Sequence, residues 1–213
     1  MKQVLGGRLL VASNINVDNL GWERGPEAKI WIKKLRDTHP DIYHHSSRLA
    51  MLAEKIAVPL ELSEEAAGQL SRGCFLHDIG KTAISRELIT QRDSFNEEQW
   101  KIIRSHPEIG AKMLEGDPGF GPEIISIVRH HHERWDGRGY PDGLAGTNIP
   151  LGARICAVLD AFDSMTSNKI YRRRISLSEA RLELIRNANA QFDPEIVHAM
   201  MEISEQTLNI YSL

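Results

Sequence analysis

Apolar residues recur every three or four positions along most of the chain after Pro26, and stretches that alternate between apolar and polar residues are nearly absent. Because 3.6 residues make one helical turn, this spacing is typical of amphipathic helices that bury one face. Pro40 interrupts the first such helix, and Pro59 ends the second. The pattern therefore predicts an all-α domain. The first two apolar faces consist of Ile30, Ile32 and Leu35, and of Leu49, Leu52, Ala53 and Ile56.

Capping residues and prolines mark where the predicted helices begin. Serine, asparagine and aspartate accept hydrogen bonds from the first N–H groups of a helix, and proline is tolerated at its first position. Ser63 is expected to cap a helix that runs toward His77. The other expected starts are the capping boxes Asn96–Gln99 and Ser176–Glu179, Pro122 and Pro150 at the first position of their helices, and the cap Asp193 followed by Pro194.

One long stretch, residues 136–147, lacks helical spacing and is rich in glycine. Loops of this length without structure of their own are usually either functional or disordered. Residues 1–26 show no consistent pattern, and we interpret them as a short N-terminal extension. The sequence thus predicts one helical domain over residues 27–213, interrupted by a glycine-rich loop.

The charge balance narrows the range of partners. The 26 lysine and arginine residues and the 29 aspartate and glutamate residues give a net charge of −3. This balance argues against a broad surface for duplex nucleic acid, although it allows a small anionic ligand. No apolar run reaches the ~18 residues of a membrane span, and the N-terminus lacks a signal-peptide core. Cys74 and Cys156 form no CxxC pair. We therefore expect a cytoplasmic protein without membrane contact, whose cysteines are buried free thiols.

The chain contains nine histidines, and most of them lie beside aspartate or glutamate. Adjacent helical residues point about 100° apart, so His77 and Asp78 can reach one metal ion, or Asp78 can bridge two. His45 is expected to begin one helix and His106 to end another. Asp160 lies on an apolar helical face, where a carboxylate without a partner would be costly to bury. The candidate donors, which suit iron, manganese or zinc and suffice for two ions, are His45, His77, Asp78, His106, His131, His132 and Asp160.

Six motifs follow one another along most of the chain. They are His45-Ser46-Ser47-Arg48, Leu76-His77-Asp78-Ile79-Gly80-Lys81, His106-Pro107-Glu108-Ile109-Gly110, His131-His132-Glu133-Arg134-Trp135-Asp136-Gly137-Arg138-Gly139-Tyr140-Pro141, Asp160-Ala161-Phe162-Asp163-Ser164-Met165-Thr166 and Phe192-Asp193-Pro194. Each motif alone is weakly specific, but in this order and spacing they resemble the HD-GYP phosphodiesterases, a branch of the HD-domain phosphohydrolases. The resemblance runs from about Asp41 to Pro194 and implies an HD-domain helical bundle with a glycine-rich GYP loop.

The resemblance also implies a site for two divalent ions, iron or manganese, held by the seven candidate donors. Asp78 would be the bridging carboxylate. The histidine run is ambiguous by one residue, because His130 could also bind, although the family's HHE pattern selects the next two histidines. Some members hold a third ion through a glutamate four residues before the first histidine. Asp41 stands there, one helical turn before His45, and can hold a third ion or cap the helix.

Two metal ions about 3.5–4 Å apart can hold a bridging hydroxide that attacks phosphorus in line. The resemblance makes Lys81 the cation beside the scissile phosphate. It assigns the bases and the second phosphate to Tyr140 and its loop, with Lys169 and Arg172 on the far side. Asp163 would orient a metal ligand or Lys169. Where the family usually has Arg-Pro-Tyr-Arg, this chain has Lys-Ile-Tyr-Arg at residues 169–172, so one bidentate donor is lost.

The function implied by the resemblance is hydrolysis of cyclic di-GMP to linear pGpG, to GMP, or to both. A cyclic GMP-AMP phosphodiesterase is the nearest alternative, because Lys169 leaves the base preference open. A sensor or docking module without turnover is a second alternative. The expected partners are the cyclic dinucleotide and either a second copy of the chain in a homodimer or a signalling partner that docks on the Gly139-Tyr140-Pro141 loop. A general HD nucleotidase is a third alternative, against which the long loop argues.

Overall fold

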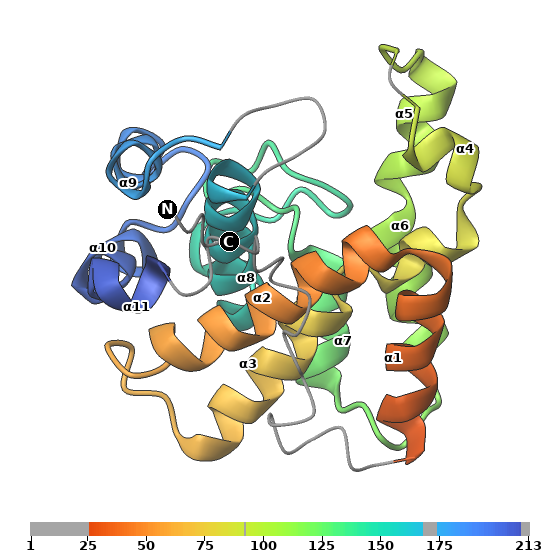
Figure 1. Cartoon of the computed structure of the whole chain (residues 1–213), viewed down its shortest axis with the longest axis horizontal. Helices are drawn as coiled ribbons and strands as arrows, with labels where there is room; N and C mark the ends of the chain where they lie inside the picture. Colours follow the sequence, from red (N-terminus) through yellow and green to blue (C-terminus); the bar gives the residue numbers. More distant parts are fainter. Residues whose placement is uncertain (1–25, 92, 168–173, 210–213) are drawn as a thin grey trace, which may run out of the picture.

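The computed structural model describes residues 26–91, 93–167 and 174–209, and in these ranges it contains helices and no β-strand. The predicted all-α fold is therefore confirmed (Figure 1). No helix within these ranges is both long and apolar enough to cross a membrane. The elements are α1 (Pro26–Thr38), α2 (Pro40–Ile56), α3 (Glu64–Leu76), η3 (Ile79–Ala83), α4 (Arg86–Ile89), α5 (Glu97–Arg104), α6 (His106–Leu114), α7 (Pro122–His130), η4 (Gly146–Asn148), α8 (Leu151–Thr166), α9 (Leu177–Arg186), α10 (Pro194–Glu202) and α11 (Glu205–Asn209).

Most of the predicted helix starts are confirmed. The side chain of Ser63 accepts a hydrogen bond from the N–H of Ala66, and both predicted capping boxes are formed. Pro150 is an exception, because it precedes α8 instead of occupying the first helical position. Its ψ of 139° is extended, while its carbonyl accepts the first helical hydrogen bonds, from Ala153 and Arg154. Pro150 therefore acts as the N-cap residue.

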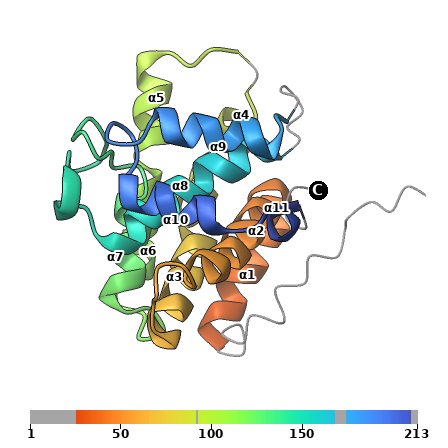
Figure 2. The ribbon, with the colours of Figure 1, turned by 90° about the vertical axis from the view of Figure 1, so that its left-hand side faces the viewer.

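Two clusters of buried side chains form the core, and α2, α3 and α7 contribute to both. Leu49 and Leu52 of α2 face the cluster around α8, whereas Tyr43 and Ala50 face the cluster around α1 and α6. The C-terminal helices α9, α10 and α11 lie together beside α8 (Figures 1 and 2). Full burial of each large apolar side chain stabilises the fold by about 1.5–3 kcal/mol. A helix packed on two faces, such as α2, has its rotation about its own axis fixed.

A close backbone contact brings η3 against α6. A Cβ atom at Gly80 would lie 2.0 Å from the carbonyl oxygen of His106 and 2.6 Å from the backbone nitrogen of Gly110. Only a residue without a side chain allows this approach. Asp78 immediately precedes η3, so the contact places the carboxylate beside the start of α6.

The N-terminal extension predicted over residues 1–26 lies, apart from Pro26, outside the described residues. Helix α1 begins at Pro26, where the helical spacing of the sequence also begins. Both cysteines are buried and free, as expected from the apolar runs around them.

Candidate metal centre

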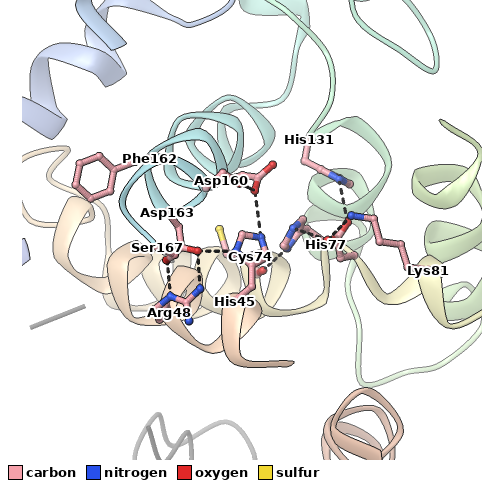
Figure 3. A network of polar contacts seen from close by, with 12 residues as sticks. His45, Arg48, Cys74, His77, Lys81, His131, Asp160, Phe162, Asp163 and Ser167 are labelled. Carbon is pink, nitrogen blue, oxygen red and sulfur yellow. Dashed lines mark hydrogen bonds and ion pairs between the residues drawn. The ribbon is translucent and has the colours of Figure 1, made fainter. Parts of the chain in front are cut away.

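Two groups of histidine and aspartate side chains lie next to each other where five segments of the bundle meet. Figure 3 shows His45, His77, His131 and Asp160 from these groups. Within each group, the candidate ligand atoms all lie within 4.8 Å of one another. Both groups contain only nitrogen and oxygen donors, which suit a borderline or hard divalent ion. The first group, called the Asp78 group below, contains Asp78, His106, His131 and His132, and the second, the His45 group, contains His45, His77 and Asp160.

Four donors, namely His45, the pair His77 and Asp78, and His106, occupy helix positions that differ from those expected. His77 is the C-cap residue of α3, and Asp78 (φ −98°, ψ 8°) begins the turn into η3, so the pair does not share one helix. His106 begins α6 and does not end the helix before it. Pro107 explains this start, because proline is accommodated in the first helical turn and disrupts later ones. His45 lies in the second turn of α2, since that helix already begins at Pro40.

Asp78 connects the two groups. Its Oδ1 atom lies 3.1 Å from Nε2 of His106, and its Oδ2 atom lies 3.4 Å from Nε2 of His77. Lys81 donates a hydrogen bond of 2.6 Å to Oδ2. Burial favours the neutral acid, but the charge of Lys81 and the contacts with His77 and His106 outweigh it and hold the pKa of Asp78 well below its usual value. The carboxylate is therefore ionised between the two groups.

Three of the histidines share one orientation. The Nδ1 atoms of His77, His106 and His131 lie 2.7, 2.7 and 2.8 Å from carbonyl oxygens three residues earlier in the chain. Because a carbonyl oxygen only accepts, each Nδ1 carries the hydrogen, and Nε2 of the neutral ring presents its lone pair. An Nδ1–H bound to a backbone carbonyl is the usual arrangement of a metal-binding histidine.

The lone pairs of these rings lack partners of their own. Nε2 of His77 is buried and forms no hydrogen bond with the described residues. The Nε2 atoms of His106 and His131 face each other at 3.2 Å, a contact that needs a cation or a proton between two lone pairs. Burial lowers the pKa of His131 well below its usual value, and burial beside the imidazole of His106 lowers that of His132 to about 3. The residues therefore fit a metal ion, which requires neutral imidazole ligands.

The His45 group contains an ion pair. Nε2 of His45 lies 3.1 Å from Oδ1 of Asp160, and Nδ1 lies 2.7 Å from Oδ2 of Asp163. Burial by itself would lower the pKa of His45, but the hydrogen bonds to Asp160 and Asp163 raise it to about 9. Asp160 lies on the apolar face expected of it, with 24% of its side chain exposed, and His45 is its partner.

Arg48 completes this arrangement and was not assigned a role from the sequence. Its Nε and Nη2 atoms donate hydrogen bonds of 2.5 and 2.8 Å to the two carboxylate oxygens of Asp163, which is fully buried. Arg48 follows His45 by three positions on α2, so both side chains reach one carboxylate on α8. The three-residue spacing of His45 and Arg48 in the first motif was the sequence signal that could have indicated a role for Arg48.

A pocket of about 370 Å³ opens beside the Asp78 group. Its wall includes His132 and Asp160 from the two groups, together with three arginines and an aromatic ring. The tyrosine ring stacks on His132 with the ring centroids 4.8 Å apart. The three arginines had no role in the sequence interpretation, although two of them lie four residues apart in the fourth motif, which was the available signal. They and the aromatic residue are Arg104, Arg134, Arg138 and Tyr140.

The glycine-rich loop is held by one buried carboxylate and one close contact. Glu133 accepts hydrogen bonds of 2.7, 3.0 and 3.1 Å from the N–H groups of Asp142, Gly143 and Leu144. A Cβ atom at Gly139 would lie 2.4 Å from the backbone nitrogen of Arg134. The loop thus folds back on the end of α7, and this conformation places Tyr140 against the donors.

The remaining candidates lie elsewhere. Asp41 is exposed in the first turn of α2 and belongs to neither group. His130 turns away from the donors, and its Nε2 atom lies 2.9 Å from Asp142 of the loop. Lys169 and Arg172 lie outside the described residues.

A family model and several curated proteins are similar to this chain. A family model described as HD domain matches residues 29–196. Cyclic di-GMP phosphodiesterase PA4108 of Pseudomonas aeruginosa is 32% identical over 179 residues, which cover 84% of this chain and 43% of that protein. The 3′3′-cGAMP-specific phosphodiesterase 2 of Vibrio cholerae is 31% identical over 159 residues, which cover 74% of this chain and 30% of that protein. The chain therefore spans less than half the length of either relative.

The fold also has a counterpart among solved structures. The crystal structure of the cyclic GMP-AMP specific phosphodiesterase V-cGAP3 of Vibrio cholerae superimposes with a TM-score of 0.67 at 20% identity, and the match covers 88% of this chain and 50% of that chain. The helical fold, the two donor groups and the family model all point to the same protein family. The chain belongs to the HD-domain family, and its similarity to the curated relatives together with its Gly139-Tyr140-Pro141 loop places it in the HD-GYP branch.

Proposed function

We propose that this chain is a metal-dependent phosphodiesterase that hydrolyses cyclic di-GMP to linear pGpG, to GMP, or to both. The observation that carries the proposal is the convergence of seven nitrogen and oxygen donors in two groups linked by Asp78, beside a pocket with several arginines. The similarity to a curated cyclic di-GMP phosphodiesterase supports the choice of substrate.

The two groups would hold two divalent ions, with iron or manganese as the first choices for this donor set. When bound, such ions activate water at neutral pH and neutralise charge on the phosphate. Asp41 belongs to neither group, so the proposal rests on two ions. The orientation of His77, His106 and His131 favours this role, because each presents a lone pair fixed by a backbone carbonyl.

Each hydrolytic step adds water to one phosphorus and breaks one bond between that phosphorus and a ribose oxygen. One step opens the ring to give pGpG, and a second step gives two GMP molecules. The chain stabilises the charge that develops on the phosphate oxygens. Lys81 lies beside Asp78 and is assigned to this role, and Arg104 and Arg138 of the pocket supply further positive charge near the donors, whereas Arg134 is paired with Asp136.

The substrate would lie over Tyr140, whose ring stacks on His132 at the edge of the donors. Burial raises the pKa of Tyr140, so its phenol is neutral and the ring offers a flat surface to a base. We further propose that Lys169 and Arg172 contact the part of the substrate farther from the donors. Cyclic GMP-AMP is the second candidate substrate, and the similarity to a curated 3′3′-cGAMP-specific phosphodiesterase favours testing it.

The test is anaerobic incubation of protein loaded with manganese or iron with cyclic di-GMP, cyclic GMP-AMP or cyclic di-AMP, followed by chromatography of the products. Formation of pGpG or GMP that EDTA prevents is the expected result. Cleavage of cyclic GMP-AMP alone would change the substrate. If no dinucleotide were cleaved although two ions were bound per chain, the chain would be a sensor and not an enzyme.

A further inference from the structure

A second hollow, of about 510 Å³, adjoins the pocket at the metal donors, and Arg104 and Tyr140 line both. Its lining residues place it between α5 and the glycine-rich loop, and α5 buries none of its own residues. Trp100 of α5 forms part of its wall and has 45% of its surface exposed. A ligand at the donors can therefore extend along the loop into this second hollow.

Arg104 is held between two aromatic rings. Its Cζ atom lies 5.4 Å from the ring centroid of Trp100 and 5.6 Å from that of Tyr140. Aromatic faces attract the guanidinium and restrict its movement, while its N–H donors, which lie in the guanidinium plane, stay available to a ligand. Arg104 forms no ion pair with any residue in the described ranges. It is thus an exposed, unpaired cation that contacts two aromatic rings beside the candidate active site.

The acidic residues of the hollow indicate which ligand suits it. Glu97 and Glu108 line it together with Arg104 and Lys101, so two carboxylates balance two cations. A hollow without net positive charge does not favour a phosphate, whereas its carboxylates accept hydrogen bonds from a base. Guanine presents acceptors at O6 and N7, which suit the paired donors of an arginine, and donors at N1 and N2, which suit a carboxylate. Adenine carries a donor at N6 in place of O6, so the same arginine fits it poorly.

We propose that this hollow is a guanine-recognition subsite, in which Arg104 binds the O6 and N7 edge of one base and Trp100 supports its face. The proposal rests on the proposed function, since the base belongs to the cyclic dinucleotide whose phosphate lies at the donors. Recognition of single bases by stacking on aromatic rings and by hydrogen bonds to their edges is general in proteins that bind unpaired nucleotides. Arg104 and Trp100 are specificity residues in this scheme.

The test compares Arg104→Ala, Arg104→Lys and Trp100→Ala with cyclic di-GMP and cyclic di-AMP as substrates. One bidentate contact between arginine and guanine corresponds to about 5- to 150-fold in affinity. Arg104→Ala is expected to raise KM for cyclic di-GMP by about that range while changing KM for cyclic di-AMP less than threefold, roughly, and to affect kcat little. Arg104→Lys, which keeps the charge and loses the fork, should give an intermediate KM. Trp100→Ala should raise KM for both substrates, because stacking is tolerant of base identity.

Arg186→Ala is the matched control, since Arg186 is an exposed arginine on α9 that pairs with Glu183. An equal rise in KM for both substrates with Arg104→Ala would assign Arg104 to phosphate and overturn the guanine assignment, as would an unchanged KM. Equilibrium dialysis of cyclic di-GMP with the metal-free chain in EDTA gives a readout that does not depend on hydrolysis. Binding that depends on Arg104 without turnover would contradict the proposed enzyme and support the subsite, whereas turnover that is independent of Arg104 would do the reverse.

Discussion

The carboxylate of Asp163 lies 2.7 Å from Nδ1 of His45, although the two residues are 118 positions apart. Arg48 also binds the Asp163 carboxylate and holds it in place. Because this carboxylate binds Nδ1 of His45, the other ring nitrogen, Nε2, faces Asp160. His77, His106 and His131 use backbone carbonyls to orient their rings, and His45 uses a carboxylate. A carboxylate increases the basicity of the ring more than a carbonyl does, and the hydrogen bonds to Asp160 and Asp163 raise the pKa of His45 to about 9.

Replacement of Asp163 should weaken metal binding by the His45 group. Asp163→Asn keeps the size of the side chain and removes its charge, and loss of such an outer partner typically lowers metal affinity by about 10- to 100-fold. Metal content after dialysis against graded chelator concentrations measures the change. Asp142→Asn is the matched control, because Asp142 also contacts an arginine and a histidine but lies outside both donor groups. Equal metal loss in both variants would contradict the role of Asp163.

Removal of the link between the two groups should abolish metal retention. The double variant His77→Ala, Asp78→Ala deletes one donor of each group, and neither residue lies inside a helix. The helical content measured by circular dichroism is therefore expected to stay close to that of the parent protein. Metal analysis should show no bound ions, and cyclic di-GMP should no longer be cleaved. Unchanged activity would overturn the assignment of the metal centre.

Metal binding by the His45 group should release a proton at neutral pH. The folded, metal-free protein holds His45 protonated up to a pKa of about 9, whereas His131 and His132 are already neutral. About one proton is therefore expected per chain at pH 7, and none above the pKa of His45. Titration calorimetry with manganese in two buffers of different protonation enthalpy measures this number. A value of zero at pH 7 would show that His45 is not a ligand or is not protonated.

The same raised pKa stabilises the metal-free fold at low pH. An unperturbed histidine has a pKa of about 6.5, so the charged form of His45 is favoured more in the folded chain than in the unfolded one. The resulting contribution to the free energy of unfolding is complete below pH 6.5, roughly, and is lost as the pH rises through about 9. Thermal unfolding of the metal-free protein across this interval should show the loss, and His45→Ala should reduce it.

Two glycine substitutions should separate the effect of loop geometry on KM from the effect of helix propensity on stability. Gly139→Ala would place a methyl group 2.4 Å from the backbone nitrogen of Arg134, so the loop that carries Tyr140 must move, and KM for cyclic di-GMP should rise. Gly68→Ala lies in α3 with no atom within 4 Å of the new methyl group, and it should stabilise the fold by about 0.5–1 kcal/mol. Thermal unfolding and kinetics of both variants check the contrast. If Gly68→Ala raised KM as much as Gly139→Ala does, the rise in KM could not be attributed to the geometry of the loop.

The helices of this protein could be predicted from the sequence because their causes are local. An apolar face, a capping box or a first-turn proline involves residues within about one turn of each other, and Ser63, Asn96 and Ser176 behave as predicted. Pro107 was equally local evidence for a helix that begins at His106 and was overlooked. The motif order and its resemblance to the HD-GYP family also indicated which residue types would gather.

The tertiary structure decided how the metal donors are divided into two groups and which residues hold their side chains in place. The pairing of His45 with Asp163, and the position of Arg104 between Trp100 and Tyr140, depend on how α2 packs on α8 and how the loop folds back on α7. No periodicity encodes such contacts, because they join segments whose separation in space is set by the whole core. The sequence by itself determined the helical class and the chemical identity of the donors. Packing determined their division into two groups and the orientation of each ring.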